Sequence, residues 1–287
     1  MVAIGASSYG MLTTFVKLIE RYNYNVYEIT LSEYLIGVPL LFIFERLFFH
    51  KTRAQKRIKP TPKNIRNLML AGMSMGVTTL VYYFSVKFIS VSIAIVLLMQ
   101  SVWIGVLFDS LLNKTRPSLL KIIAVIFVLG GTLLATNVFF NAVQLDWRGV
   151  TLGLIAAVSY SITILATNRT AKNLPAISRS KWMATGALLL VAVVTFPFLL
   201  QSFHPKILYT YGLFFGFFGA FLPALLLNYG MPKINLGVGA IISSMELPVA
   251  VSLAYFLLNE YVNAYQWLGI LLILTAIVGM NIKKIQN

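Results

Sequence analysis

The stretch from Tyr229 to Glu260, YGMPKINLGVGAIISSMELPVAVSLAYFLLNE, places one carboxyl group, that of Glu246, inside a long uncharged run. The stretch from Tyr83 to Lys114, YFSVKFISVSIAIVLLMQSVWIGVLFDSLLNK, aligns with it without a gap at an offset of 146 residues. The aligned pairs include Tyr83 with Tyr229, Lys87 with Lys233, and Leu111-Leu112-Asn113 with Leu257-Leu258-Asn259. Matched apolar residues carry little information in such a chain, but the register of Tyr, Lys and Asn indicates an internal duplication. We therefore expect two copies of one unit, residues 1–140 and 145–284.

The composition predicts an integral membrane protein. Of the 287 residues 59% are hydrophobic and only 11% are charged, and the mean hydropathy is +0.83. Soluble domains are about half apolar and a quarter charged, and a soluble fold of this length could not cover so much apolar surface. The chain has no cysteine, which excludes disulfides, cysteine–zinc sites and thiol catalysis.

Ten apolar segments are long enough to cross a bilayer, which takes about 20 helical residues. We expect all ten to be helices, because a span must satisfy its backbone hydrogen bonds internally and none shows the alternation of barrel strands. Five spans in each copy is an odd number, so the second copy should enter the membrane in the opposite orientation. The segments are Val2–Ile19, Ile29–Phe49, Leu68–Phe88, Ser90–Leu112, Leu119–Phe140, Gly149–Thr167, Met183–Leu200, Ile207–Tyr229, Leu236–Leu258 and Ala264–Ile282.

The basic residues predict the orientation. With the N-terminus in the cytoplasm, 18 of the 23 Lys and Arg residues fall in inner loops and 5 on the outer side. This bias predicts that both termini are cytoplasmic. The net charge of +15 is spread over short loops, which is typical of topology signals; we expect no nucleic-acid partner, and expect the basic loop from Arg46 to Arg66 to lie against anionic lipid headgroups.

Glu246 is the strongest candidate for a functional residue. It lies about ten residues into its segment, near the bilayer centre, where a charge costs a few kcal/mol. Such a group faces a wet cavity, pairs with a cation or carries a proton. The structural alternative is a protonated carboxyl group hydrogen-bonded to Ser243, Gln100 or a backbone carbonyl for packing alone.

Gln100 is the counterpart of Glu246 in the first copy, and Trp103 lies three residues further on the same helix face. We expect Gln100 to contact the substrate or Glu246, and Trp103 to stack on the substrate, with ordinary packing as the alternative for Trp103. Pro248 removes a hydrogen bond in mid-helix and predicts a kink that offers backbone groups to a ligand.

Tyrosines supply further candidates for the cavity. Tyr9 and Tyr160 match in a weaker echo of the repeat, GASSYG with AAVSYS, and we expect both to line the cavity, together with Tyr83 and Ser243. Interfacial placement is the alternative for these tyrosines. Two other carboxyl groups have structural expectations: Glu33 is expected to point outward or to pair with Lys17 or Arg21, and Asp109 to pair with Lys114, Arg116 or Lys121.

The chain lacks the motifs of catalysis. There is no P-loop, no H-E-x-x-H and no G-x-S-x-G, and the two histidines lie in predicted loops. We therefore expect neither an enzyme nor a metal or other cofactor.

Several of these features together resemble the drug/metabolite transporter superfamily with two EamA domains. The resemblance rests on the tandem five-segment repeat, the Y-G-x-x-x-x-F-V-K run that starts at Tyr9, and the pattern of Met245, Glu246, Pro248 and the following L-L-N-E. The first copy departs from it, since Val102 replaces the proline and Gln100 the glutamate. The resemblance implies a monomeric inner-membrane carrier, usually an exporter, with a cavity lined by helices one, three, four, six, eight and nine.

The sequence favours a secondary transporter that moves a small organic solute, such as an amino acid or an amphiphilic compound, by alternating access at the interface of the repeats. Two alternatives stay open at this point. One is a non-transporting membrane protein, either a lipid-modifying enzyme or an assembly subunit. The other is a flippase for lipids or lipid-linked headgroups.

Overall fold

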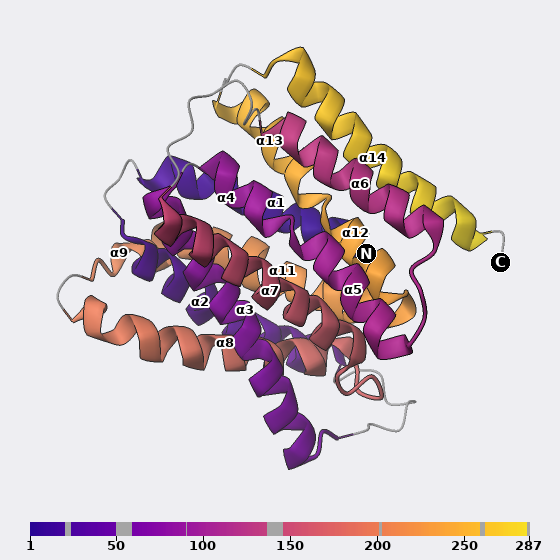
Figure 1. Cartoon of the computed structure of the whole chain (residues 1–287). Coiled ribbons are helices and arrows are strands. Elements are labelled where there is room, and N and C mark those ends of the chain that lie inside the picture. Colours follow the sequence, from indigo (N-terminus) through magenta and orange to yellow (C-terminus); the bar gives the residue numbers. More distant parts are fainter. Residues whose placement is uncertain are drawn as a thin grey trace.

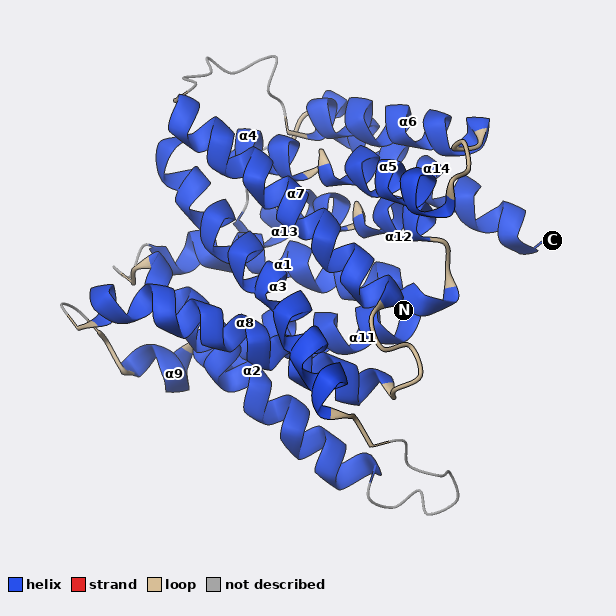
Figure 2. Ribbon diagram, turned by 60° about the horizontal axis from the view of Figure 1, so that its bottom comes forward, coloured by secondary structure: helices blue, strands red, loops and turns tan. Residues whose placement is uncertain are grey.

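The fold is a bundle of helices, which follow one another along the chain in the order of the apolar segments (Figures 1 and 2). The computed structural model describes residues 1–20, 24–49, 59–89, 91–136, 146–200, 203–258 and 262–285, and every regular element in those ranges is helical. The first half contains α1 (Val2–Glu20), α2 (Val26–Phe49), α3 (Pro62–Phe88), α4 (Val91–Leu98), α5 (Ser101–Asn113) and α6 (Leu119–Ala135). The second half contains α7 (Trp147–Arg169), α8 (Ala176–Leu199), α9 (Lys206–Thr210), α10 (Gly212–Phe215), η2 (Gly216–Phe221), α11 (Leu222–Gly230), η3 (Met231–Lys233), α12 (Leu236–Ser243), α13 (Glu246–Leu258) and α14 (Ala264–Ile285).

The expectation of an all-helical chain is confirmed, and that of ten spans only in part. Within the described residues, seven helical segments are long and apolar enough to cross a membrane. Three further apolar helices are shorter: Val2–Leu12, Leu119–Ala135 and Ala264–Met280. All ten predicted segments thus coincide with helices where the structure describes them, with Ser90 and residues 137–140 outside the described residues. Ten as the number of spans stays a prediction.

The fourth segment of each half is broken in its middle. The first break, at Met99 and Gln100, separates α4 from α5, and the second, at Ser244 and Met245, separates α12 from α13. At each break a backbone N–H shifts to the carbonyl three residues back: Gln100 N lies 3.0 Å from Leu97 O, and Met245 N lies 3.1 Å from Ile242 O. The segment of the first copy is interrupted although Val102 stands where the second copy has Pro248. A tightened turn at this position therefore does not require a proline.

The eighth segment is less regular than the single helix that we expected over Ile207–Tyr229. It is divided into α9, α10, η2, α11 and η3. Pro223 has no N–H to donate to the carbonyl of Gly219, and the N–H of Leu222 bonds Phe217 O, five residues back. The result is a π-helical turn, an irregularity that is frequent at functional sites.

The two halves pack against each other through equivalent segments. Helix α2 packs on α8, α5 packs on α12, and α6 packs on α14; Figure 1 shows α6 and α14 side by side at one edge of the molecule. Helix α3 packs on α7 and α8, while α1 and α2 pack on the irregular segment of the second half. Close approach requires glycine in the α6–α14 pair, where a Cβ on Gly131 would lie 2.7 Å from the carbonyl oxygen of Gly269.

Polar contacts gather at one end of the bundle, where α5 ends and α6 begins. Lys121 Nζ lies 2.7 Å from Asp109 Oδ2, which confirms the ion pair expected for Asp109, and 3.0 Å from Asn235 Oδ1. Arg169 Nη2 donates to Asn113 Oδ1 over 2.6 Å. This end collects loops that we assigned to the cytoplasmic side; the centre of the basic loop, residues 50–58, and Arg21 lie outside the described residues.

Candidate functional site

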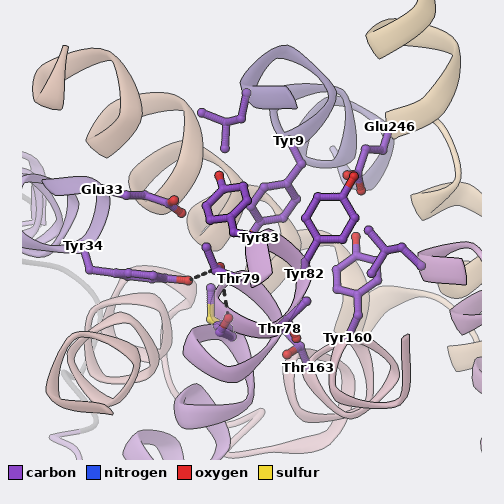
Figure 3. A pocket seen from close by; sticks show the side chains of 13 residues that line it. Tyr9, Glu33, Tyr34, Thr78, Thr79, Tyr82, Tyr83, Tyr160, Thr163 and Glu246 are labelled. Atoms are coloured by element: carbon purple, nitrogen blue, oxygen red, sulfur yellow. Dashed lines mark hydrogen bonds between the residues drawn. The ribbon is translucent and has the colours of Figure 1, made fainter. Parts of the chain in front are cut away.

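A cavity of about 70 Å³ lies among helices of both halves. Figure 3 shows its lining, with Glu33 and Glu246 entering from opposite sides and tyrosine rings between them. The side chains come from α1, α2, α3, α4, α7 and α13, so α2 takes part and residues 206–233 do not, in contrast to the lining that the family resemblance implied. The lining residues are Tyr9, Leu12, Glu33, Tyr34, Met75, Thr78, Thr79, Tyr82, Tyr83, Leu98, Tyr160, Thr163 and Glu246.

Glu246 reaches the cavity from the break in the second half. It is the first residue of α13, and its side chain is buried. The first N–H groups of a helix have no partner within the helix, and the helix dipole is positive at this end, so this position stabilises a negative charge. Gly10 of α1 allows the two backbones to meet here, because a Cβ at Gly10 would lie 2.3 Å from the carbonyl oxygen of Glu246.

Glu33 is the second carboxyl group of the cavity, and the outward orientation expected for it is corrected. Its side chain on α2 is 1% exposed, and its Oε2 atom has no hydrogen-bond partner. The carboxyl group rests on the π-helical turn, since a Cβ at Gly219 would lie 2.7 Å from Glu33 Cδ. The side chain of Lys17 and all of Arg21, the partners that we expected, lie outside the described residues.

Five tyrosines surround the space between the two carboxyl groups. The rings of Tyr9 and Tyr160 meet edge to face with centroids 6.4 Å apart, and those of Tyr82 and Tyr83 lie 6.0 Å apart. The hydroxyl of Tyr34 bonds Thr79 Oγ1 over 3.1 Å, as the dashed line in Figure 3 marks. The hydroxyls of Tyr82 and Tyr160 are buried and have no partner.

The cavity therefore combines acidic character with unmet hydrogen-bonding capacity. Among the residues that the structure describes, its lining includes two carboxyl groups and no Lys, Arg or His. Three of their polar atoms, Glu33 Oε2 and the hydroxyls of Tyr82 and Tyr160, have no hydrogen-bond partner. A buried polar group without a partner costs about 1–3 kcal/mol, so the arrangement is suited to a polar occupant that supplies the missing bonds.

The structure brings together four of the eight residues that we selected from the sequence. Glu246, Tyr9, Tyr160 and Tyr83 all line the cavity. Ser243 is buried, and its hydroxyl donates to the carbonyl of Gly239 over 3.0 Å.

Gln100 and Trp103 do not line this cavity, and the substrate contacts expected for them stay a prediction. Trp103 is 42% exposed on the outside of the bundle, and its Nε1 donates to Gln100 Oε1 over 3.0 Å. Gln100 in turn donates to the carbonyl of Val96 over 3.0 Å. Pro248 lies in the first turn of α13, just after the break, and does not line the cavity.

The polar residues that sequence reasoning missed are Glu33, Tyr34, Tyr82 and the three threonines of the lining. One signal could have found Glu33, because an ionisable residue within an apolar segment is a functional candidate by default. Tyr34, Tyr82 and the threonines gave no such signal, because both residue types are common in apolar helices, where a threonine hydroxyl can bond a carbonyl of the preceding turn.

Comparisons with known proteins agree with this architecture. A model of the EamA-like transporter family matches residues 1–137 and 147–282. No curated protein matches the chain. One solved structure, described only as the crystal structure of a protein, shares 13% sequence identity over 98% of each chain with a TM-score of 0.76, a likeness that shows the fold alone.

Proposed function

The chain belongs to the EamA-like transporter family, and from that membership we propose that it is a secondary transporter which carries a small organic solute through the cavity between its two halves. The observation that carries the proposal is the buried cavity itself, with carboxyl groups and unpartnered hydroxyls held between helices of both halves. Members of this family are transporters of the drug/metabolite type rather than enzymes.

We propose that transport proceeds by alternating access between two inverted repeats, residues 1–140 and 145–284. Support comes from the ungapped duplication and from packing that joins equivalent segments of the halves. Transporters with inverted repeats bind their substrates at the repeat interface, where broken helices meet the site. Here the two broken segments pack on each other through α5 and α12, and the break of the second half carries Glu246 into the cavity.

The proposed setting is the inner (plasma) membrane, with both termini in the cytoplasm and the protein acting as a monomeric exporter. The excess of Lys and Arg in one set of loops supports this orientation. Several of those loops meet at one end of the bundle, where Lys121 and Arg169 bond the end of α5.

Flux into proteoliposomes tests the proposal. The purified protein is reconstituted and offered a panel of radiolabelled organic solutes that includes amines, amino acids, neutral polyols and carboxylic acids. We expect saturable flux of at least one of them, and we expect Glu246→Gln to reduce that flux at least tenfold, because the variant removes the charge that reaches the cavity from the break.

Glu45→Gln serves as the matched control. Glu45 is on α2 like Glu33, but it pairs with Lys181 near the end of the bundle and does not line the cavity. Saturable flux should survive in this variant. Absence of flux for every solute, or full flux of every solute in Glu246→Gln, would count decisively against the proposal.

A further inference from the structure

We propose that the transported solute is a small organic cation, an amine or quaternary ammonium ion, held between the carboxyl groups of Glu33 and Glu246 against the tyrosine rings. This inference rests on the proposed function and specifies the substrate class of the same cavity. It selects among the solutes considered from the sequence, because an amine and an amino acid make opposite demands on a binding site.

The first argument for a cationic solute is the charge of the residues that line the cavity. Two carboxyl groups face a space that is bordered by no basic side chain among the lining residues. In surroundings of low dielectric constant a cation is attracted to an ionised carboxylate and favours its ionised form, whereas an anion is repelled. The α-carboxylate of an amino acid would be repelled by both carboxylates, and the lining offers no basic side chain to offset that repulsion.

The second argument for a cationic solute is the direction of the hydrogen bonds that the cavity can make. Glu33 Oε2 and the hydroxyl oxygens of Tyr82 and Tyr160 are buried without partners. All three can accept a hydrogen bond; the two tyrosine hydroxyls can also donate one, whereas an ionised carboxylate can only accept, so Glu33 Oε2 is the position that calls for a donor. An alkylammonium ion has donors and no acceptor, so its N–H groups match these unmet positions in kind.

The third argument for a cationic solute is the aromatic character of the cavity walls. Tyr9, Tyr34, Tyr82, Tyr83 and Tyr160 all contribute to the walls. The face of a tyrosine ring attracts a cation, and aromatic walls are a recurring way to hold quaternary ammonium groups. The cavity would therefore accommodate N-methyl groups as well as N–H groups. A methylated nitrogen would be held by the ring faces, and an N–H group by hydrogen-bond acceptors.

The volume limits the size of the cation. At about 70 Å³ the cavity is much smaller than the 300–1,000 Å³ of pockets for drug-sized ligands. A cation of a few heavy atoms is consistent with this space. A lipid headgroup with its attached glycerol is not.

Tetramethylammonium and tert-butanol form the decisive pair of probes, because they have nearly the same shape and number of heavy atoms and differ in charge. Binding is measured by calorimetry on the purified protein in detergent, with acetate as the anionic probe. We expect tetramethylammonium to bind at least tenfold more tightly than tert-butanol, and acetate not to bind.

Variants locate the binding to the cavity. Glu33→Gln and Glu246→Gln should each weaken tetramethylammonium binding at least tenfold, since each removes a charged partner while keeping the shape of the side chain. Glu45→Gln should leave binding unchanged. Glu33→Asp and Glu246→Asp keep the charge and should retain measurable affinity, which separates the loss of charge from misfolding; monodisperse elution in gel filtration checks the fold of each variant.

The outcomes distinguish this inference from the proposed function. Flux of tetramethylammonium into proteoliposomes, reduced at least tenfold in both glutamine variants, supports both. Saturable flux of neutral or anionic solutes without preference for cations overturns the cation inference and leaves the transporter in place. Binding of tetramethylammonium without flux of any solute supports the cation site and contradicts the transport function.

Discussion

The carboxyl group of Glu33 owes its position to a missing side chain on the opposite helix. Gly219, in the π-helical turn η2, leaves the space in which that carboxyl group lies, with Cδ only 2.7 Å from where a Cβ would be. No other residue type leaves this space, because every side chain begins with a Cβ.

Gly219→Ala should therefore displace Glu33 and weaken both stability and transport. Overpacking of a well-packed site costs about 1–3 kcal/mol, and the displaced carboxyl group would no longer meet a ligand in the cavity. Thermal unfolding in detergent and solute flux in proteoliposomes measure the two effects.

Gly130→Ala is the matched control, because a Cβ at Gly130 would meet nothing within 4 Å. In a helix interior this change should be neutral or slightly stabilising, since alanine favours helix by up to about 1 kcal/mol over glycine. Equal behaviour of the two variants would contradict the role assigned to Gly219.

Glu246 and Glu33 differ in how far the sequence alone could identify them as residues of the cavity. Glu246 could be selected because it interrupts an apolar run at its centre, where a charge is costly. Glu33 lies nearer the end of its segment, where outward orientation is a competing solution, and only packing against the second half decides between them. Trp103 and Gln100 share a helix face, as their spacing predicted, but the sequence could not show that this face is turned away from the cavity.

At the scale of elements, helix ends are held together by buried polar groups. Arg179 of α8 is 1% exposed and donates to the carbonyls of Thr170 over 2.9 Å and Asn228 over 2.8 Å, and also to that of Thr167. These carbonyls belong to the C-terminal ends of α7 and α11. The last carbonyl groups of a helix have no hydrogen-bond partners within the helix. A cation at a helix C-terminus also interacts favourably with the helix dipole.

Arg179→Lys should destabilise the protein by about 2 kcal/mol or more, even though the charge is kept. An ammonium group is a compact donor on a flexible stem and cannot reproduce the planar fork that bonds three carbonyls, and each lost bond to a charged group costs about 1.5–3 kcal/mol. Equilibrium unfolding in denaturant measures the change.

Arg148→Lys provides the comparison, because Arg148 is exposed beside Trp147 at the start of α7. Such a surface substitution should stay within about 0.5 kcal/mol. If Arg179→Lys proved as mild as this control, the guanidinium would not be what joins α7 to α11.

At the scale of the whole molecule, hydrophobic length was enough to predict where the helices lie, because a lipid environment leaves few alternatives for an apolar segment. Pro248 predicted a kink close to the break that divides α12 from α13, but the sequence did not reveal the break between α4 and α5 or the π-helical turn in residues 216–221. The first break occurs without a proline. At the second, Gly10 of α1 packs against the backbone of Glu246, a contact between distant segments that a local pattern does not contain.

The inversion of the two halves is testable because the chain contains no cysteine, so each introduced thiol is the only one. Lys87 and Lys233 are equivalent under the offset of 146 residues, and both are exposed. An odd number of spans in each half requires equivalent positions to face opposite sides of the membrane. We therefore expect Lys87→Cys to react with a membrane-impermeant maleimide from outside intact cells, and Lys233→Cys to react only after the membrane is opened. If both thiols were labelled from the same side, the halves would be parallel, and alternating access between inverted repeats could not be the mechanism of this protein.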